Sequence, residues 1–330
     1  MSIQRAILFG ARDLRLIEVP LDTDTLQPDQ IYVETIITAL STGTDLGNYE
    51  GRSTEVPGAP DYPRPVGYSN VGIIHRCGSA VAQWAPGQRV FSLRPHQSAY
   101  IANQSDPLVL IPEGVDLAAA SLAYLTQLGV ASLRQVNYQA GERVAVVGLG
   151  VIGLATVGVA TAMGARVTAI ANSDFRRSLA LQLGATQAYL AGDAPASIAD
   201  LVVLTANPWP AFQESVHLAR YCGRITVLGF PGRAQQPPAF NPLDPAWFYG
   251  KQLTITGAGF SPRTSNPPHE IAFNLARNLE LIFDYMQMGR LPLEKIITHR
   301  YPWHDMKQAY ELALAHSKEM AAAVFEWPAR

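Results

Sequence analysis

Residues 141–153 read GERVAVVGLGVIG, and this stretch decides how the middle of the chain folds. The apolar run 143–147 has the composition of a strand that is buried on both faces. Gly148, Gly150 and Gly153 follow directly, at the spacing where a tight turn leads from a strand into a helix. Such a turn brings the free N–H groups of the helix start toward a pyrophosphate. The stretch therefore predicts a dinucleotide-binding unit, with a glycine-rich turn that binds nothing as the alternative.

The same region has the length of a membrane span, because residues 144–165 carry no charge. Five of these residues are glycine, which is unfavourable in a lone spanning helix. We find no second apolar segment of this kind in the sequence. A buried strand, a glycine turn and a buried helix are therefore expected here.

From about residue 140 onward, strands and helices alternate along the sequence. The strands are apolar throughout, which indicates a parallel, doubly wound sheet covered on both faces. Strands are predicted at 143–147, 166–171, 199–206, 224–230 and 253–259, and helices at 151–163, 174–183 and 209–221. This order is typical of a Rossmann unit.

The two ends of the chain follow a different pattern. Residues 1–125 contain short strands separated by proline and glycine, which predicts a barrel-like or sandwich-like β unit. A helix is predicted at 117–133. The C-terminal part should form a helix, a strand, a helix and a last strand, at 268–288, 293–302, 303–315 and 321–327. We expect these last β elements to pack on the N-terminal β unit, so that the fold class is α/β.

Composition excludes several classes of function. A length of 330 residues predicts two domains at about 150 residues each. Only 16% of the residues are charged and the formal net charge is −2, which argues against nucleic acid or an anionic membrane as a partner. Two cysteines exclude a disulfide framework and a thiolate-rich zinc site. The N-terminus lacks the apolar region of a signal peptide, so a cytoplasmic location is expected.

The end of the second Rossmann strand predicts the choice of coenzyme. An NAD-binding site usually has a carboxylate there to hold the ribose 2′-hydroxyl, but this chain has Ala171. Asn172 and Ser173 supply hydrogen-bond donors, and Arg176 and Arg177 supply positive charge for a 2′-phosphate. We therefore expect NADP(H) rather than NAD(H). The predicted cofactor contacts are Gly148, Gly150, Val151, Ile152, Gly153, Asn172, Ser173, Arg176, Arg177, Thr205 and Gly229.

Taken together, these features resemble the medium-chain dehydrogenase/reductase superfamily, the proteins similar to zinc-containing alcohol dehydrogenase. The landmarks are TALSTGTDLGNYEG (38–51), RPVGYSNVG (64–72), PGQRV (86–90), LIPEGVDLAAASL (110–122), GERVAVVGLGVIG (141–153), LGA (183–185), GRITVLGF (223–230) and GRLPLEKIITHRYP (289–302). The resemblance implies a GroES-like β-barrel catalytic domain at 1–125 and 285–330 and a Rossmann domain at 126–284. It also implies an active site in the cleft between the domains, and a homodimer that pairs strand 253–259 with its copy.

The positions where zinc-dependent relatives carry metal ligands are different here. Thr42 stands at the position of the cysteine ligand. In the Gly–His–Glu motif, Tyr68 stands in place of the histidine and Ser69 in place of the glutamate. The third ligand position falls near Tyr124. Because hydroxyl groups are not credible ligands of a catalytic zinc, we predict no zinc. The segments STGTD and GYSNVG resemble a zinc-less branch that includes bacteriochlorophyllide a dehydrogenase. That similarity is short and supports a zinc-independent dehydrogenase, not a chlorophyll substrate.

Without a metal, hydrogen-bond donors must stabilise the negative charge that hydride transfer builds on a carbonyl oxygen. The predicted catalytic residues are Tyr68, Thr44 and Thr42. Tyr68 is the preferred proton donor, since a phenol donates a hydrogen bond and ionises if its pKa is lowered. A packed cleft tyrosine is the alternative, and Asp45 is interpreted as structural.

Three functions remain open on this sequence. The first is a zinc-independent, NADP(H)-dependent oxidoreductase for an alcohol/carbonyl pair. The second is NADPH-dependent reduction of a conjugated C=C bond, as in enoyl and quinone reductases, which also lack zinc. The third is a non-catalytic NADP(H)-binding protein.

Overall fold

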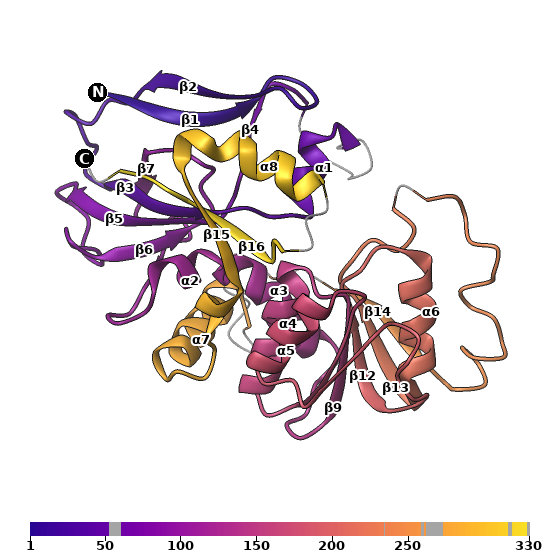
Figure 1. The fold of residues 1–330 in the computed structure, drawn as a ribbon. Coiled ribbons are helices and arrows are strands. Elements are labelled where there is room, and N and C mark those ends of the chain that lie inside the picture. The colour runs from indigo at the N-terminus through magenta and orange to yellow at the C-terminus, as the bar shows by residue number, and fades with distance from the viewer. Residues whose placement is uncertain (53–60, 234, 259–260, 262–272, 316–318, 329–330) are drawn as a thin grey trace. The chain divides into compact units, whose positions relative to one another are not determined.

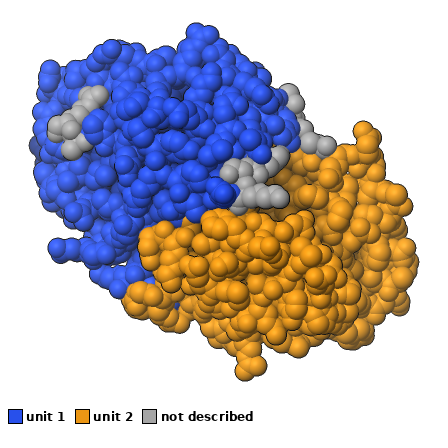
Figure 2. Space-filling model, viewed as in Figure 1, with its two compact units in different colours: residues 1–124, 279–287, 297–330 blue, residues 125–278, 288–296 orange. Residues whose placement is uncertain are grey.

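The computed structural model describes residues 1–52, 61–233, 235–258, 261, 273–315 and 319–328. The chain divides into two compact units, coloured separately in Figure 2. Unit 1 contains Met1–Tyr124, Leu279–Gln287 and Ile297–Arg330, and unit 2 contains Leu125–Asn278 and Met288–Ile296. The second segment of the catalytic domain was expected to begin at residue 285, whereas the second segment of unit 1 begins at Leu279. Residues Met288–Ile296 belong to unit 2.

Unit 2 is built on a six-stranded parallel sheet with the order β11-β10-β9-β12-β13-β14 (Figure 1). This order is that of a dinucleotide-binding fold, in which the first strand lies in the middle and later strands are added first on one side of it and then on the other. The central strand β9 places Val146 opposite Ala169 on one side and Val203 on the other, and all three are fully buried. The strands are β9 (Arg143–Val147), β10 (Arg166–Ile170), β11 (Gln187–Tyr189), β12 (Ala199–Leu204), β13 (Ala219–Val227) and β14 (Thr254–Gly257). The predicted Rossmann sheet is therefore confirmed.

The helices of unit 2 follow these strands as predicted, with one shorter than expected. They are α4 (Val151–Ala162), α5 (Asp174–Gln182) and α6 (Trp209–Leu218). The helix predicted at 209–221 ends at Leu218, because Ala219 is already extended and begins β13. The Lys251 ammonium donates to the carbonyls of Val216, His217 and Ala219, which closes the end of α6.

Unit 1 contains two β-sheets, and the seven-stranded one joins the two ends of the chain (Figure 1). Its order is β15-β16-β3-β5-β6-β8, with β7 paired to β3, and a three-stranded sheet has the order β2-β1-β4. The strands are β1 (Ser2–Leu8), β2 (Leu14–Pro20), β3 (Gln30–Ala39), β4 (Arg64–Pro65), β5 (Asn70–Cys77), β6 (Arg89–Ser92), β7 (Ala99–Asn103), β8 (Val109–Leu110), β15 (Ile297–Pro302) and β16 (Ala322–Glu326). The expected packing of C-terminal strands on the N-terminal β unit is confirmed.

A buried cluster in unit 1 shows how the two ends hold together. Val324 and Phe325 of β16 pair with Ala39 and Thr38 of β3. Phe325 is fully buried, and Tyr310 from the helix α8 (Met306–Leu314) stacks on it. The short helix α1 (Thr44–Tyr49) contributes Tyr49 to the same cluster. Burial of this apolar surface stabilises the unit.

Several predicted helix and strand boundaries need correction. The helix predicted at 117–133 is two helices, α2 (Leu117–Ser121) and α3 (Ala123–Gln135), with the break where the Ser121 hydroxyl donates back to the Ala118 carbonyl. The segments predicted at 293–302 and 303–315 each begin with a 3₁₀ turn, Leu293–Ile296 and Trp303–Asp305. The helix predicted at 268–288 is α7 (Leu275–Gln287), and residues 268–272 lie outside the described part of the chain.

Within the described residues, no helix is long and apolar enough to cross a membrane. The uncharged segment that raised this possibility is divided between β9 and α4, and α4 has only 12 residues.

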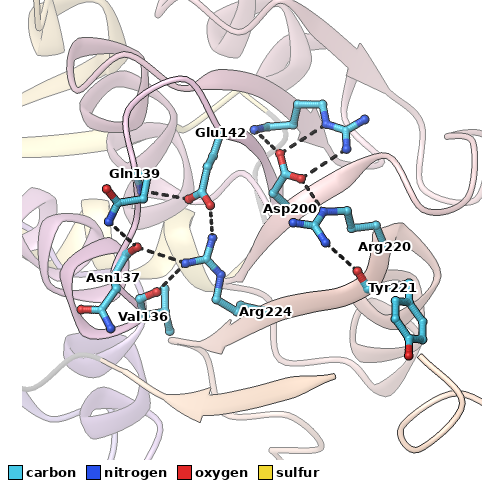
Figure 3. Close-up of polar contacts among 9 residues, drawn as sticks. Val136, Asn137, Gln139, Glu142, Asp200, Arg220, Tyr221 and Arg224 are labelled. Atoms are coloured by element: carbon cyan, nitrogen blue, oxygen red, sulfur yellow. Dashed lines mark hydrogen bonds and ion pairs between the residues drawn. The ribbon is translucent and has the colours of Figure 1, made fainter. Parts of the chain in front are cut away.

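Charged side chains join the strand starts of unit 2 (Figure 3). Asp200 of β12 accepts from the Arg143 backbone N–H at 2.8 Å, from the Arg143 guanidinium at 3.2 Å, and from the Arg220 Nε at 2.5 Å. Nearby, Arg224 of β13 forms an ion pair with Glu142 and donates to the Val136 carbonyl at 2.6 Å. These contacts tie β9, β12 and β13 together near the N-terminal ends of these strands.

We predict that Asp200→Asn lowers the free energy of unfolding by about 1–2 kcal/mol at pH 7. The loss should be smaller than for a fully buried ion pair, because both arginines are about half exposed to solvent. Burial alone would raise the pKa of Asp200, but the hydrogen bonds from Arg143 and Arg220 outweigh it and hold the pKa well below its usual range. This stabilisation is present above the unfolded-state pKa and is lost as the pH falls below it. Thermal unfolding from pH 7 to pH 3 measures the effect.

The matched control is Glu326→Gln, which removes the half-exposed ion pair with Arg300. Its effect should stay within about 0.5 kcal/mol at either pH. Equal effects of the two variants at pH 7 would contradict the prediction.

Candidate active site

The glycine turn of unit 2 has the geometry that the sequence predicts. Gly148 has φ +94°, and a Cβ there would lie 2.7 Å from the Cβ of Ala206. A Cβ on Gly153 would lie 2.0 Å from the Gly148 carbonyl oxygen. The Thr205 hydroxyl donates to that same carbonyl at 2.8 Å. Both glycines are therefore required for α4 to begin directly against the end of β9.

The start of α4 is open to an anion. Gly150 is the N-cap residue and carries no side-chain cap. The first N–H groups of α4, including those of Val151 and Ile152, have no partner within the helix. A Cβ on Gly150 would have one neighbour within 4 Å, the Arg176 guanidinium at 4.0 Å. This turn fits a dinucleotide pyrophosphate, with an arginine at its edge.

The two arginines that follow the second strand have different surroundings. Arg176 reaches back over the glycine turn, and its Nη1 donates to the Leu149 carbonyl at 3.4 Å. Arg177 donates to the Ala171 carbonyl at 2.5 Å and forms an ion pair with Asp174. The charge of Arg177 is therefore balanced locally by Asp174, whereas Arg176 lies beside the glycine turn.

The remaining predicted cofactor contacts lie at the same ends of the strands. The Ser173 hydroxyl accepts from the Arg176 N–H at 3.4 Å and caps α5. Asn172 precedes it and is exposed. Gly229 follows β13, and a Cβ there would lie 2.9 Å from the carbonyl oxygens of Thr205 and Ala206. Only glycine therefore allows the backbone at this point to pass so close to the residues that follow β12.

Hydroxyl groups gather in unit 1 at the positions that the resemblance described above equates with zinc ligands. The Tyr68 hydroxyl donates to the Ser41 Oγ and is hydrogen bonded to the Thr44 side chain. The Tyr68 ring packs edge-on against Tyr124, with 5.2 Å between ring centroids. Thr42 lies in the same turn, directly before α1, and is half-buried. The structure thus brings together the predicted Tyr68 and Thr44, and adds Ser41, which the sequence analysis missed.

The pKa of Tyr68 is raised in the structure, so the condition for its ionisation is not met. Burial raises the pKa of Tyr68, and the nearby Asp45 carboxyl raises it further. Hydrogen bonds with Ser41 and Thr44 offset only part of this effect on the pKa. At neutral pH Tyr68 is therefore a neutral phenol and not a phenolate.

These side chains do not fit a catalytic zinc. Thr42, Tyr68, Ser69 and Tyr124 offer neutral hydroxyls, whereas zinc takes cysteine, histidine or carboxylate ligands. Across the described ranges, no cluster of three or more His, Cys, Asp or Glu side chains is placed to hold a metal ion.

Asp45 has the structural contacts that were expected of it. Its carboxyl group is 1% exposed and accepts from the Ser41 N–H at 2.9 Å and from the Gly67 N–H at 3.3 Å. Burial raises the pKa of Asp45 to about 7, and these hydrogen bonds and the charge of Arg64 offset only part of the effect. Asp45 therefore ties the turn before α1 to the segment that carries Tyr68.

His96 belongs to this region, and no spacing in the sequence identified it. Its ring is fully buried and lies under Gly67, where a Cβ would be only 2.5 Å from the ring. The ring packs edge-on against Phe325, with 5.1 Å between ring centroids. Its Nε2 lies 3.9 Å from the Asp45 carboxyl. The positive φ of Gly67, +86°, is the local feature that accommodates this ring.

Comparison with known proteins shows which chains this one resembles. A family profile described as zinc-binding dehydrogenase matches residues 151–273. The chain is 24% identical over 326 residues to L-galactonate-5-dehydrogenase of Escherichia coli strain K12, covering 86% of this chain and 87% of that one. Residues 151–273 are therefore similar to zinc-binding dehydrogenases, and the longer match is to a sugar-acid dehydrogenase. The matched residues all belong to unit 2 and cover part of it, whereas Thr42, Tyr68 and Tyr124 lie outside the match.

Solved structures show the same fold. Galactitol-1-phosphate dehydrogenase from Escherichia coli superposes with a TM-score of 0.81 at 18% identity, covering 98% of this chain and 99% of that one. A protein from Sinorhizobium meliloti 1021, solved bound to NADP, gives a TM-score of 0.80 at 19% identity and covers 99% of both chains. The fold is therefore that of the medium-chain dehydrogenases, with a GroES-like domain and a Rossmann domain.

Proposed function

We propose that this chain is a zinc-independent, NADP(H)-dependent oxidoreductase that transfers hydride between the nicotinamide and an alcohol/carbonyl substrate. The observation that carries the proposal is the hydroxyl cluster around Tyr68, at the positions where related dehydrogenases hold zinc. The dehydrogenases named above support the reaction class, and the glycine turn supports the dinucleotide.

The nucleotide contacts of unit 2 account for the coenzyme part of the proposal. The open N-terminus of α4 binds the pyrophosphate, and Gly148 and Gly153 hold that turn in place. Arg176 and the donors at Asn172 and Ser173 bind the 2′-phosphate, because Ala171 removes the carboxylate that would repel it. The bound nicotinamide supplies the hydride or accepts it.

The hydroxyl cluster of unit 1 accounts for the proton. Hydride transfer to a carbonyl leaves negative charge on oxygen, which a hydrogen-bond donor must stabilise. The Tyr68 hydroxyl gives its proton to that oxygen, and Ser41 and Thr44 hold the phenol in position. A neutral phenol would also protonate the carbon of a reduced enone, so NADPH-dependent enoyl or quinone reduction is the alternative.

The catalytic part of the proposal predicts that Tyr68→Phe lowers kcat by at least about 100-fold, the lower range for loss of a general acid. Tyr124→Phe, which alters the neighbouring ring that packs on Tyr68, should stay within a few-fold of the wild type. NADPH oxidation with panels of ketones, enones and quinones measures both. Turnover of enones alone would favour the alternative, and tight NADPH binding without any turnover would favour a non-catalytic protein.

The coenzyme part predicts that NADPH binds at least about tenfold more tightly than NADH, since a charge-assisted contact is worth roughly 1.5–3 kcal/mol. Arg176→Ala should weaken NADPH and leave NADH nearly unchanged. Arg177→Ala is the matched control and should change the ratio little, because Asp174 already pairs with it. Ala171→Asp should reverse the preference. Equal binding of NADH and NADPH by the wild type would refute this reading of 171–177.

The metal part predicts that the purified protein contains no stoichiometric zinc and that chelators leave its activity unchanged. The reason is that Thr42, Tyr68 and Ser69 offer no suitable donor atoms. Elemental analysis is the measurement, and about one zinc per chain would contradict the prediction.

The assembly part predicts a homodimer. Strand β14 is the last strand in the sheet order of unit 2 and pairs with β13. Its backbone can pair with the same strand of a second copy, which removes an exposed sheet edge. Light scattering at micromolar concentration should give twice the mass of the chain, and a monomer would contradict it. Residue 259 of the predicted 253–259 interface lies outside the described residues.

We also propose that the protein is located in the cytoplasm.

A further inference from the structure

His96 is a buried polar side chain that the proposed reaction does not use. It is fully buried, and neither of its ring nitrogens has a hydrogen-bond partner among the described residues. An imidazole without partners is costly to bury. The polar group that its Nε2 faces is the Asp45 carboxyl, at 3.9 Å, and this carboxyl is itself buried.

The position of Asp45 connects this pair to Tyr68. One carboxyl oxygen accepts from the N–H of Ser41, whose hydroxyl is the hydrogen-bond partner of Tyr68. The other accepts from the N–H of Gly67, the residue before Tyr68. A change in the charge of Asp45 therefore acts on both sides of the Tyr68–Ser41 hydrogen bond.

The charged and titratable groups around Asp45 come from separate elements. Arg64 of β4 acts on it as a positive charge, and His96 faces it from the segment between β6 and β7. Tyr310 of α8 and Tyr68 both feel the charge of Asp45. Tyr68 and Tyr310 are neutral phenols. The protonation state of the His96–Asp45 pair therefore decides whether this group of side chains contains a negative charge.

We propose that His96 and Asp45 are positioning residues that form a buried pair holding one proton, and that this proton sets how readily Tyr68 gives up its own. When the pair releases its proton to solvent, one negative charge remains beside Tyr68 and opposes formation of a phenolate. When the pair holds the proton, Tyr68 is the stronger acid. The inference deepens the proposed function, because it rests on Tyr68 as the proton donor.

The two partners have distinct parts in this pair. Burial lowers the pKa of His96 to about 3, so its imidazole is neutral at neutral pH. Burial raises the pKa of Asp45 to about 7, so the proton resides mainly on the carboxyl. The imidazole dipole favours the ionised carboxyl when the Nε2 carries the hydrogen. Loss of the imidazole should therefore make Asp45 harder to ionise.

The test is an NMR titration of the full chain labelled with ¹³C at tyrosine Cζ, from pH 5 to pH 9. The Tyr68 resonance is identified by its absence in Tyr68→Phe. It should move with a midpoint near that of Asp45, and Asp45→Asn should abolish the movement. His96→Leu should raise the midpoint by about half a pH unit or more, and His96→Gln, which keeps an amide donor, by a smaller amount.

The matched control is His299→Leu, a half-buried histidine on β15 that bonds to Thr298 and should leave the midpoint unchanged. His96→Gln also serves if His96→Leu does not fold. A Tyr68 resonance that stays constant across the range, or the same midpoint in the wild type and both His96 variants, would overturn the proposal.

The titration needs no substrate, so it separates this proposal from the proposed function. A coupled Tyr68 resonance in a protein whose Tyr68→Phe variant keeps full turnover supports the buried pair and overturns Tyr68 as the donor. If the Tyr68 resonance stays constant and Tyr68→Phe abolishes turnover, the buried pair is overturned and Tyr68 is supported as the donor.

Discussion

The contact between α4 and the carbonyl oxygen of Gly148 is the constraint on which unit 2 depends. A side chain at Gly153 would place its Cβ 2.0 Å from that oxygen, so α4 can begin here only with a hydrogen atom at this position. The Thr205 hydroxyl donates to the same oxygen and links the turn to the end of β12. The open helix start, the strand ends and Arg176 all take their positions from this contact.

In unit 1 the corresponding constraint is polar. Asp45 accepts hydrogen bonds from two backbone N–H groups that belong to separate segments, and it is buried while it does so. In a metal enzyme, an ion would fix the geometry of such a region through its ligands. Here a carboxyl group, a histidine ring under Gly67 and a set of hydroxyls hold the segments together.

The sequence was most informative where local pattern determines structure. Apolar runs and the glycine spacing predicted the parallel sheet and the turn, because buried strands and positive φ angles place strict limits on residue type. The three-residue strand β11 and the early end of α6 were missed, since both depend on pairing with distant segments. Ser41 and His96 were missed for the same reason. Their partners, Tyr68 and Asp45, lie 27 and 51 residues away in the sequence. The raised pKa of Tyr68 follows from its burial, which no motif encodes.

The pairing of β16 with β3 has a consequence for how the chain is made. Strand β3 is complete by residue 39, but its neighbour on one side is translated only at residues 322–326. All six strands of unit 2 leave the ribosome in between, so this unit can close its sheet while unit 1 still lacks Tyr310 and Phe325. Domains of a nascent chain usually fold from the N-terminus onward. Here the unit that contains the N-terminus can complete its sheet only after residues 322–326 have been made. During this interval, the nascent chain exposes an unpaired stretch of β3, which is the kind of surface that chaperones bind and that aggregates if left uncovered.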